Sequence, residues 1–313
     1  MPKRKIILVV IALLVLAMPP YTMASERLTL ILDWFPNVDH LPLYVAKQQG
    51  FFKDSGLEIK IISPSDTSDA LKLAATNKAD LAISYEPQTI IAAARGLDIT
   101  VIGRLVEHPL TTLLFLEGHG IDTPSDLEGK RIGYTVPGLM DVLLEAFARL
   151  NGIENYQAIN VGFNIVASLT AGKVDAVMGP FKTFETVTMR RKGYAVGYFE
   201  LEKHGIPDYD ELLFVCGPES RKKKAMAISA FRAAVAQAIR YARANPDQAL
   251  EDYFKQVPEA DRQIETEAFH LTLPYFAHSQ QHNPERWQTF ADFALQYGLI
   301  DRPVDVKKIL QIQ

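Results

Sequence analysis

Residues 28–62 decide the fold of this chain, and they read LTLILDWFPNVDHLPLYVAKQQGFFKDSGLEIKII. Leu28 to Asp33 alternates weakly between apolar and polar residues, which predicts a strand. Leu41 to Gln49 has the spacing of an amphipathic helix, and Gly50 ends it. Leu57 to Ile62 alternates apolar and charged residues, which predicts a second strand. The stretch is therefore a β-α-β unit, the building block of a parallel sheet.

The same alternation of strands and helices continues to residue 105 and starts again near residue 111. Strands of this second series are predicted at Thr112–Leu116, Arg131–Thr135, Ala158–Val161 and Ala176–Met178. The pattern predicts an α/β protein of two lobes, each a mostly parallel sheet flanked by helices. A length of 313 residues also favours two lobes over one core. The residues after Cys216 are almost wholly helical, and we expect them to cover the first lobe.

The chain is expected to cross between the lobes twice, near Val106–Leu110 and again between Tyr198 and Leu213. The first lobe would then comprise residues 25–107 and 212–313, and the second residues 108–211. Open α/β sheets bind ligands beyond the carboxyl ends of their strands. We therefore expect a ligand cleft between the lobes, with the crossings as its hinge.

The first 24 residues have the composition of a secretory signal. The basic run Lys3–Lys5 precedes an apolar run from Ile6 to Met18, and Thr22–Ala24 places small residues where a signal peptidase cleaves. An apolar run of about a dozen residues is shorter than the roughly 20 that span a bilayer. No Cys lies near this site for lipid attachment. We predict cleavage after Ala24 and a periplasmic location.

Composition argues against several kinds of partner and site. The formal net charge of −4 becomes more negative once the basic signal is removed, which argues against nucleic acid. Cys216 is the single cysteine, so no intrachain disulfide and no Cys-based metal site is possible. His278 and His282 lie four residues apart without a third ligand, and we expect them at the surface, not at a metal. No hydrolytic or phosphate-binding motif is present, and a monomer is sufficient.

Ligand-binding candidates follow the predicted strands. Trp34 comes directly after the first strand, where its indole offers a flat surface for an aromatic ring. Asp33, Asn37 and His40 flank it, although Asn37 equally suits a helix cap and His40 equally suits packing in the first helical turn.

Three further loops between a strand and a helix hold candidates. They are Ser65 and Asp66, Tyr85 and Glu86, and, in the second lobe, Tyr134, Pro137 and Gly138. The first pair suits helix capping as well as a polar ligand group. The second pair holds the same topological position as Trp34. In the third loop, glycine and proline allow the backbone to approach a ligand.

Several motifs resemble those of a known family. Residues 33–40 have the form Asp-Trp-x-Pro-Asn-x-x-His, and the likeness continues through Lys130–Tyr134, Gly172–Ala176 and Tyr275-Phe276. The chain resembles the periplasmic pyrimidine-precursor-binding proteins of thiamine salvage. These are grouped with taurine, sulfonate and nitrate binders in the type II periplasmic-binding-protein class. The likeness covers essentially the whole mature chain.

The resemblance implies a type II fold and the substrate-binding role of an ABC importer, with a permease of the inner membrane as partner. The implied ligand is a thiamine-related pyrimidine, formylaminopyrimidine or hydroxymethylpyrimidine, and no cofactor is implied. Glu185 would pair with the ring nitrogen and exocyclic amine of an aminopyrimidine by two charge-assisted bonds. A solvated helix carboxylate is the alternative for Glu185. Phe181 and Tyr44 are weaker ligand candidates.

Other functions stay open. A receptor for an alkanesulfonate such as taurine, for nitrate or for riboflavin would share the fold, and so would a sensory protein that docks on a receptor. The similar pyrimidine synthases of thiamine biosynthesis carry a Lys and a His four residues apart, together with a run of cysteines. Here Ser84 and Gln88 stand at the matching positions and Cys216 is alone. The resemblance therefore implies a binding protein without catalytic residues, not an enzyme.

Overall fold

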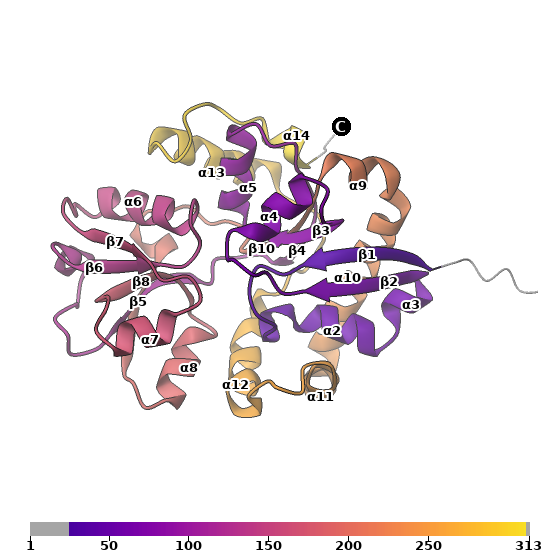
Figure 1. Ribbon diagram of the computed structural model, residues 1–313, viewed down its shortest axis with the longest axis horizontal. Helices are drawn as coiled ribbons and strands as arrows, with labels where there is room; N and C mark the ends of the chain where they lie inside the picture. The colour runs from indigo at the N-terminus through magenta and orange to yellow at the C-terminus, as the bar shows by residue number, and fades with distance from the viewer. Residues whose placement is uncertain (1–24, 311–313) are drawn as a thin grey trace, which may run out of the picture.

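The structure is a computed structural model and describes residues 25–310. The predicted signal segment, residues 1–24, lies outside the described part. The strands form two five-stranded sheets, of order β2-β1-β3-β10-β4 and β7-β6-β8-β5-β9 (Figure 1). We call each sheet with its flanking helices a lobe. The strands are β1 (Glu26–Ile31), β2 (Leu57–Ile62), β3 (Leu81–Ser84), β4 (Thr100–Val106), β5 (Thr111–Leu116), β6 (Arg131–Tyr134), β7 (Gln157–Asn160), β8 (Ala176–Phe181), β9 (Val196–Glu200) and β10 (Leu212–Cys216).

Each sheet is mixed: four of its five strands run in the same direction, in line with the predicted parallel pattern, and one strand is reversed. In the first lobe β1 pairs in parallel with β2 and β3, whereas β10 runs antiparallel to both β3 and β4. In the second, β6 pairs in parallel with β7 and β8, and β5 runs antiparallel to β8 and β9. Both reversed strands follow a crossing between the lobes. A chain that leaves one sheet at the carboxyl end of its strands enters the other sheet from the facing edge.

The α-helices alternate with these strands and then run to the end of the described chain. They are α2 (Leu41–Gln48), α3 (Phe51–Asp54), α4 (Asp69–Ala75), α5 (Glu86–Ala94), α6 (Met140–Leu150), α7 (Ile165–Thr170), α8 (Glu185–Arg191), α9 (Pro218–Lys223), α10 (Ala225–Ala244), α11 (Pro246–Gln256), α12 (Arg262–Thr272), α13 (Pro284–Gln296) and α14 (Val306–Leu310). Short 3-10 helices are η1 (Val38–His40), η2 (Pro124–Leu127), η3 (Leu201–His204) and η4 (Leu273–Tyr275). No helix within residues 25–310 is long and apolar enough to cross a bilayer.

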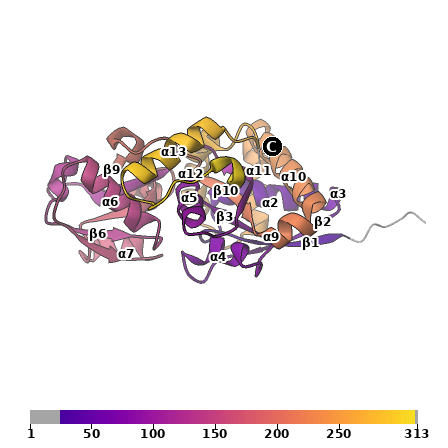
Figure 2. The same cartoon turned by 90° about the horizontal axis from the view of Figure 1, so that it is seen from above.

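The C-terminal helices cover the first lobe, on the surface predicted for them. Helices α10 and α11 pack on α2, α13 packs on α5, and α14 packs on β4 (Figures 1 and 2). Helix α12 also contacts η1 of the first lobe and α8 of the second. It therefore lies beside the space between the lobes. The chain leaves the first sheet after β4 and rejoins it at β10, and the lobe boundaries at 107/108 and 211/212 stay a prediction.

Candidate functional site

A small cavity lies between the two sheets. Its walls come from both lobes, at or just beyond the carboxyl ends of β1, β3, β6 and β8, where parallel strands of open sheets place their ligands. The lining residues are Asp33, Trp34, Asn37, Asp39, His40, Tyr85, Thr135, Ile165, Gly179, Phe181, Glu185 and Leu212.

The first-lobe wall is built on a buried carboxylate. One oxygen of Asp33 lies 2.9 Å from Nε2 of His40, and the other accepts the hydroxyl of Tyr85 at 2.8 Å. Burial, with the neighbouring charge of Asp33, raises the pKa of Tyr85 well above 10, so its hydroxyl keeps the proton that it donates. Asn37 caps η1, because its Oδ1 accepts the N–H of Asp39 at 2.9 Å. The capping alternative therefore holds for Asn37, although the residue also lines the cavity.

Glu185 begins α8 on the opposite wall. Its Oε2 accepts the N–H of Phe181 at 2.8 Å. Burial raises the pKa of Glu185 to about 8; the carboxylates of Asp39 and Asp33 add to the rise, and the Phe181 N–H opposes it. The group therefore holds its proton near neutral pH and can both donate and accept a hydrogen bond.

Asp39 is a third acidic group in the wall and was not among the predicted residues. Its Oδ1 accepts the hydroxyl of Thr272 from α12 at 2.9 Å. Burial raises the pKa of Asp39 to about 6, against the lowering effect of His40 and of the Thr272 hydroxyl. Three carboxyl groups thus line the cavity, and no Lys or Arg is among its lining residues. The lining therefore favours a ligand that brings hydrogen-bond donors for these carboxyl groups.

Thr135 makes two close contacts at the cavity, one within the second lobe and one with the first lobe. A side chain at Gly179, whose φ is +123°, would place its Cβ 2.0 Å from Oγ1 of Thr135, so this position needs glycine. The carbonyl of Thr135 accepts the hydroxyl of Thr67 from the first lobe at 2.7 Å. The glycine therefore allows β8 to approach Thr135 within the second lobe. The bond from Thr67 joins Thr135 to the first lobe.

Aromatic side chains close the rim of the cavity. The ring of Trp34 lies 4.6 Å from that of Phe163, which follows β7 in the second lobe, and Phe35 lies 4.4 Å from the same ring. Because Trp34 also lines the cavity, one indole contacts both the cavity and the opposite lobe.

Several predicted site residues do not line the cavity. Ser65 and Asp66 lie in an exposed loop, where Asp66 accepts the N–H and the hydroxyl of Ser68 at 2.8 Å each. No described side chain caps α4. The two residues line a separate pocket with residues 160–164 of the second lobe, and their role in binding stays a prediction. Glu86 is fully buried and accepts the N–H of Asp210 at 2.8 Å. Its side chain therefore points away from the cavity that Tyr85 lines.

The loop after β6 contributes a residue other than those predicted. Tyr134 ends the strand, Pro137 is half-buried, and Gly138 donates its N–H to Asp141 at the start of α6. Thr135 faces the cavity from this loop. Tyr44 packs against Tyr253 within the first lobe and is also absent from the lining.

The lining residues that sequence reasoning missed are Asp39, Thr135, Ile165, Gly179 and Leu212. Thr135 and Gly179 could have been suspected, since Thr135 ends the predicted strand Arg131–Thr135 and Gly179 directly follows the predicted strand Ala176–Met178. Ile165 and Leu212 carry no chemical signal that separates them from core residues.

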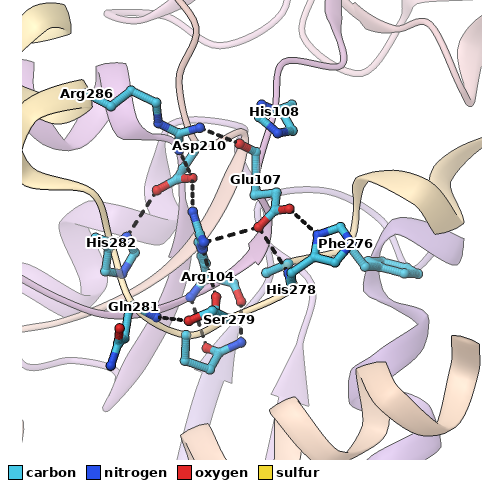
Figure 3. Close-up of polar contacts among 12 residues, drawn as sticks. Arg104, Glu107, His108, Asp210, Phe276, His278, Ser279, Gln281, His282 and Arg286 are labelled. Carbon is cyan, nitrogen blue, oxygen red and sulfur yellow. Dashed lines mark hydrogen bonds and ion pairs between the residues drawn. The ribbon is translucent and has the colours of Figure 1, made fainter.

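A network of charges lies where the chain crosses between the two sheets, and it is drawn in Figure 3. Asp210, which is fully buried, accepts from Arg104 at 3.1 Å, from His282 at 3.0 Å, and from Arg286 and Trp287. Burial alone would raise the pKa of Asp210, but the hydrogen bond from His282 and the charge of Arg286 hold it lower, at about 2. The network joins the segment before β10 to β4 and α13.

The outer edge of this network includes the first crossing. Glu107 pairs with Arg104 at 3.1 Å and accepts the N–H of His278 at 3.0 Å, and Arg286 donates to the carbonyl of Glu107 at 2.9 Å. The prediction that His282 lies at the surface was wrong: its side chain is 8% exposed, because its Nδ1 pairs with the buried Asp210. The same prediction was right for His278, which is 68% exposed.

A pH-dependent stability follows from the buried acids. We expect the ligand-free protein to lose stability as pH rises from about 5 to 8, and Glu185→Gln to reduce that loss. Between the ordinary pKa of 4.5 and the folded value of about 8, the folded state holds a proton that the unfolded state has released. One such proton changes the free energy of unfolding by about 1.4 kcal/mol per pH unit.

Urea titrations at pH 5, 6, 7 and 8 measure this slope. Glu128→Gln is the matched control, because Glu128 is exposed, and hydrogen bonds from the side-chain amide of Asn155 and then from backbone N–H groups lower its pKa. Equal slopes for the wild type and Glu185→Gln would contradict the expectation.

Comparisons with known proteins place the chain in a family. The family described as NMT1/THI5 like matches residues 37–249. The chain belongs to this family. A Haemophilus influenzae relative named "putative thiamine biosynthesis protein" is 36% identical, with 94% of each chain covered. The "formylaminopyrimidine-binding protein" of Halalkalibacterium halodurans is 28% identical, with 97% of each covered.

The family also contains enzymes. A Saccharomyces cerevisiae relative named "4-amino-5-hydroxymethyl-2-methylpyrimidine phosphate synthase" is 26% identical, with 89% of this chain and 85% of that protein covered. Among solved structures, the periplasmic aliphatic sulphonate binding protein of Escherichia coli superposes with a TM-score of 0.68 at 18% identity, over 91% of this chain and 97% of that one. The predicted two-lobed type II periplasmic-binding fold is confirmed. No group of three or more His, Cys, Asp or Glu side chains within residues 25–310 is arranged to hold a metal ion.

Proposed function

We propose that this protein is the substrate-binding component of an ABC importer and that it binds a thiamine-related aminopyrimidine in the cavity between its lobes. The ligand would be formylaminopyrimidine or hydroxymethylpyrimidine. Closure of the lobes around the ligand would present the loaded protein to the permease. A ligand that gains contacts from both lobes favours the closed state by its differential affinity.

The acid-lined cavity is the observation that carries the proposal. Three buried carboxyl groups and no lining Lys or Arg disfavour an anion such as a sulfonate or nitrate, because an anion there would be desolvated without a counter-charge. An aminopyrimidine brings N–H donors and a basic ring nitrogen. It also brings a flat ring for the indole of Trp34.

Glu185 is the proposed anchor for the amino edge of the ring. A protonated carboxyl group donates to the ring nitrogen and accepts from the exocyclic amine, and transfer of the proton makes both bonds charge-assisted. The raised pKa of Glu185, about 8, suits either form of this pair near neutral pH.

A synthase activity is the less favoured alternative. By resemblance it requires a Lys and a His at the positions of Ser84 and Gln88. Here the Ser84 hydroxyl donates to Gln88 at 3.0 Å and lies 3.0 Å from the hydroxyl of Thr89. Neither Ser84 nor Gln88 lines the cavity. The pair has a structural role that needs no cofactor, and the relative named for formylaminopyrimidine binding supports the binding role.

The location and partner of the protein are part of the same proposal. Residues 1–24 would direct export and be removed, which leaves a monomer in the periplasm with an inner-membrane permease as its partner. The negative net charge gives no reason to expect nucleic acid as a partner.

Mass spectrometry of the ligand released from the exported protein tests the proposal, paired with thermal-shift titrations of 4-aminopyrimidines, riboflavin, nitrate and taurine. A ligand that binds the folded state alone raises the melting temperature, by an increment that grows with its concentration over Kd. We expect an aminopyrimidine in the released material and stabilisation by aminopyrimidines. Stabilisation by taurine, nitrate or riboflavin without any by a pyrimidine would overturn the choice of ligand.

A further inference from the structure

The cavity contains hydrogen-bond acceptors that one anchored edge of a ligand does not use. Oδ2 of Asp39 and Nδ1 of His40 are both buried without a hydrogen-bond partner among the described residues, and each side chain is 1% exposed. Buried polar atoms without partners are uncommon in folded proteins and costly. Two of them on adjacent residues of one cavity wall call for an explanation.

The ionised carboxyl group of Asp39 makes its Oδ2 an acceptor. Oδ1 of Asp39 takes the Thr272 hydroxyl, so Oδ2 is the free oxygen of that carboxyl group. Nε2 of His40 faces Asp33 at 2.9 Å. When Nε2 donates to that carboxylate, Nδ1 of the neutral ring is an acceptor. The described residues around η1 therefore supply no hydrogen-bond donor to Oδ2 of Asp39.

The other carboxyl groups of the cavity are already engaged. Each oxygen of Asp33 has a partner, in His40 and in Tyr85, and Glu185 is the proposed anchor of the amino edge. Asp39 thus has a buried oxygen, Oδ2, that accepts no hydrogen bond from the described residues.

We propose that Asp39 is a second acidic anchor, which selects ligands whose ring substituent carries its own N–H or O–H donor, away from the amino edge that Glu185 holds. This inference rests on the proposed function, since it takes the ligand to be an aminopyrimidine. An aminomethyl, formylaminomethyl or hydroxymethyl group meets the requirement, and a methyl group does not. A cationic aminomethyl group pairs best, because it also brings the positive charge that the cavity walls lack.

The raised pKa of Asp39, about 6, is compatible with this role. Within the first lobe it interacts electrostatically with His40, Asp33, Glu265 of α12 and Tyr253 of α11, and it accepts the hydroxyl of Thr272. Glu185 interacts with it from across the cavity. At pH 7.5 the carboxyl group is mainly ionised and ready to accept.

Calorimetric titration with two matched ligands tests the inference. One is 4-amino-5-aminomethyl-2-methylpyrimidine, and the other is 4-amino-2,5-dimethylpyrimidine, which lacks the second donor. We expect the wild type to bind the first at least about tenfold more tightly, and Asp39→Asn to reduce this ratio to about threefold or less. Glu265→Gln is the control, because Glu265 is a buried acid that accepts the N–H of Val38 in the same 3-10 helix and does not line the cavity. It interacts electrostatically with Asp39, but burial raises the pKa of Glu265 to about 8, so at pH 7.5 the amide removes little charge from beside Asp39. The Glu265→Gln variant should keep the wild-type ratio.

The outcomes separate the two proposals. If neither pyrimidine binds the wild type, the proposed function fails. If both bind the wild type with equal affinity, or if Asp39→Asn leaves the ratio unchanged, the function stands and the role of Asp39 is wrong. The wild-type ratio needs no variant, so the inference stays testable even where Asp39→Asn fails to fold.

Discussion

Glu185→Ala is expected to weaken binding of a 4-aminopyrimidine by about a hundredfold or more. Hydrogen bonds to charged groups contribute about 1.5–3 kcal/mol each, and about 1.4 kcal/mol corresponds to a tenfold change in Kd. Alanine removes both bonds of the proposed anchor. It also leaves the N–H of Phe181 without its carboxylate partner, in the wall of the same cavity.

Glu185→Gln separates the loss of charge from the loss of hydrogen bonds. An amide can still donate to the ring nitrogen and accept from the exocyclic amine, so its affinity should lie between those of the wild type and the alanine variant. Calorimetry measures all three proteins, and thermal melts check that each is folded. If Glu185→Ala binds the ligand within about threefold of wild type, Glu185 is not the anchor.

Asp210→Ala should have the largest effect on stability, a loss of about 3–5 kcal/mol in the free energy of unfolding. The fully buried carboxylate holds Arg104, Arg286, His282 and Trp287. Its removal leaves two guanidinium groups largely buried without their shared counter-charge. Because the pKa of Asp210 is lowered from 3.8 to about 2, its contribution is present above pH 4 and is lost as pH falls toward 2.

Asp208→Ala is the control within the same network. Asp208 pairs with Arg286 at 3.0 Å, but its side chain is 42% exposed. Exposed pairs contribute up to about 1 kcal/mol. Urea denaturation at pH 7 compares the two variants, and an equal loss for both would show that the buried carboxylate has no special role in joining the crossings.

Much of the fold follows from local periodicity. The alternation at residues 28–62 predicted β1, α2 and β2 with boundaries that differ by a few residues at most. The alternation of apolar and polar residues does not reveal the direction of a strand, because side chains alternate between the two faces in parallel and antiparallel strands alike. The sequence therefore could not predict that β5 and β10 run against their neighbours. Strand β9 was missed, since Gly197 and the exposed Tyr198 obscure its apolar face.

The candidate site was predictable where one strand end places a distinctive side chain. Asp33, Trp34 and Tyr85 follow β1 and β3 directly, and all three line the cavity. Asp39 resembles an ordinary acidic residue in a first helical turn, and its burial depends on α12, which lies more than two hundred residues later. Glu86 was predicted at the cavity and does not line it. Tyr85 faces the cavity, and the next side chain along the backbone, that of Glu86, points the other way and bonds to Asp210.

Isothermal titration of the purified protein with hydroxymethylpyrimidine and formylaminopyrimidine, and separately with an alkanesulfonate, tests the central claim most directly. We predict saturable 1:1 binding of a pyrimidine, with a negative heat-capacity change as Trp34 and the ring are buried, and no heat of binding from the sulfonate. Saturable binding of the sulfonate with no binding of either pyrimidine would contradict the account.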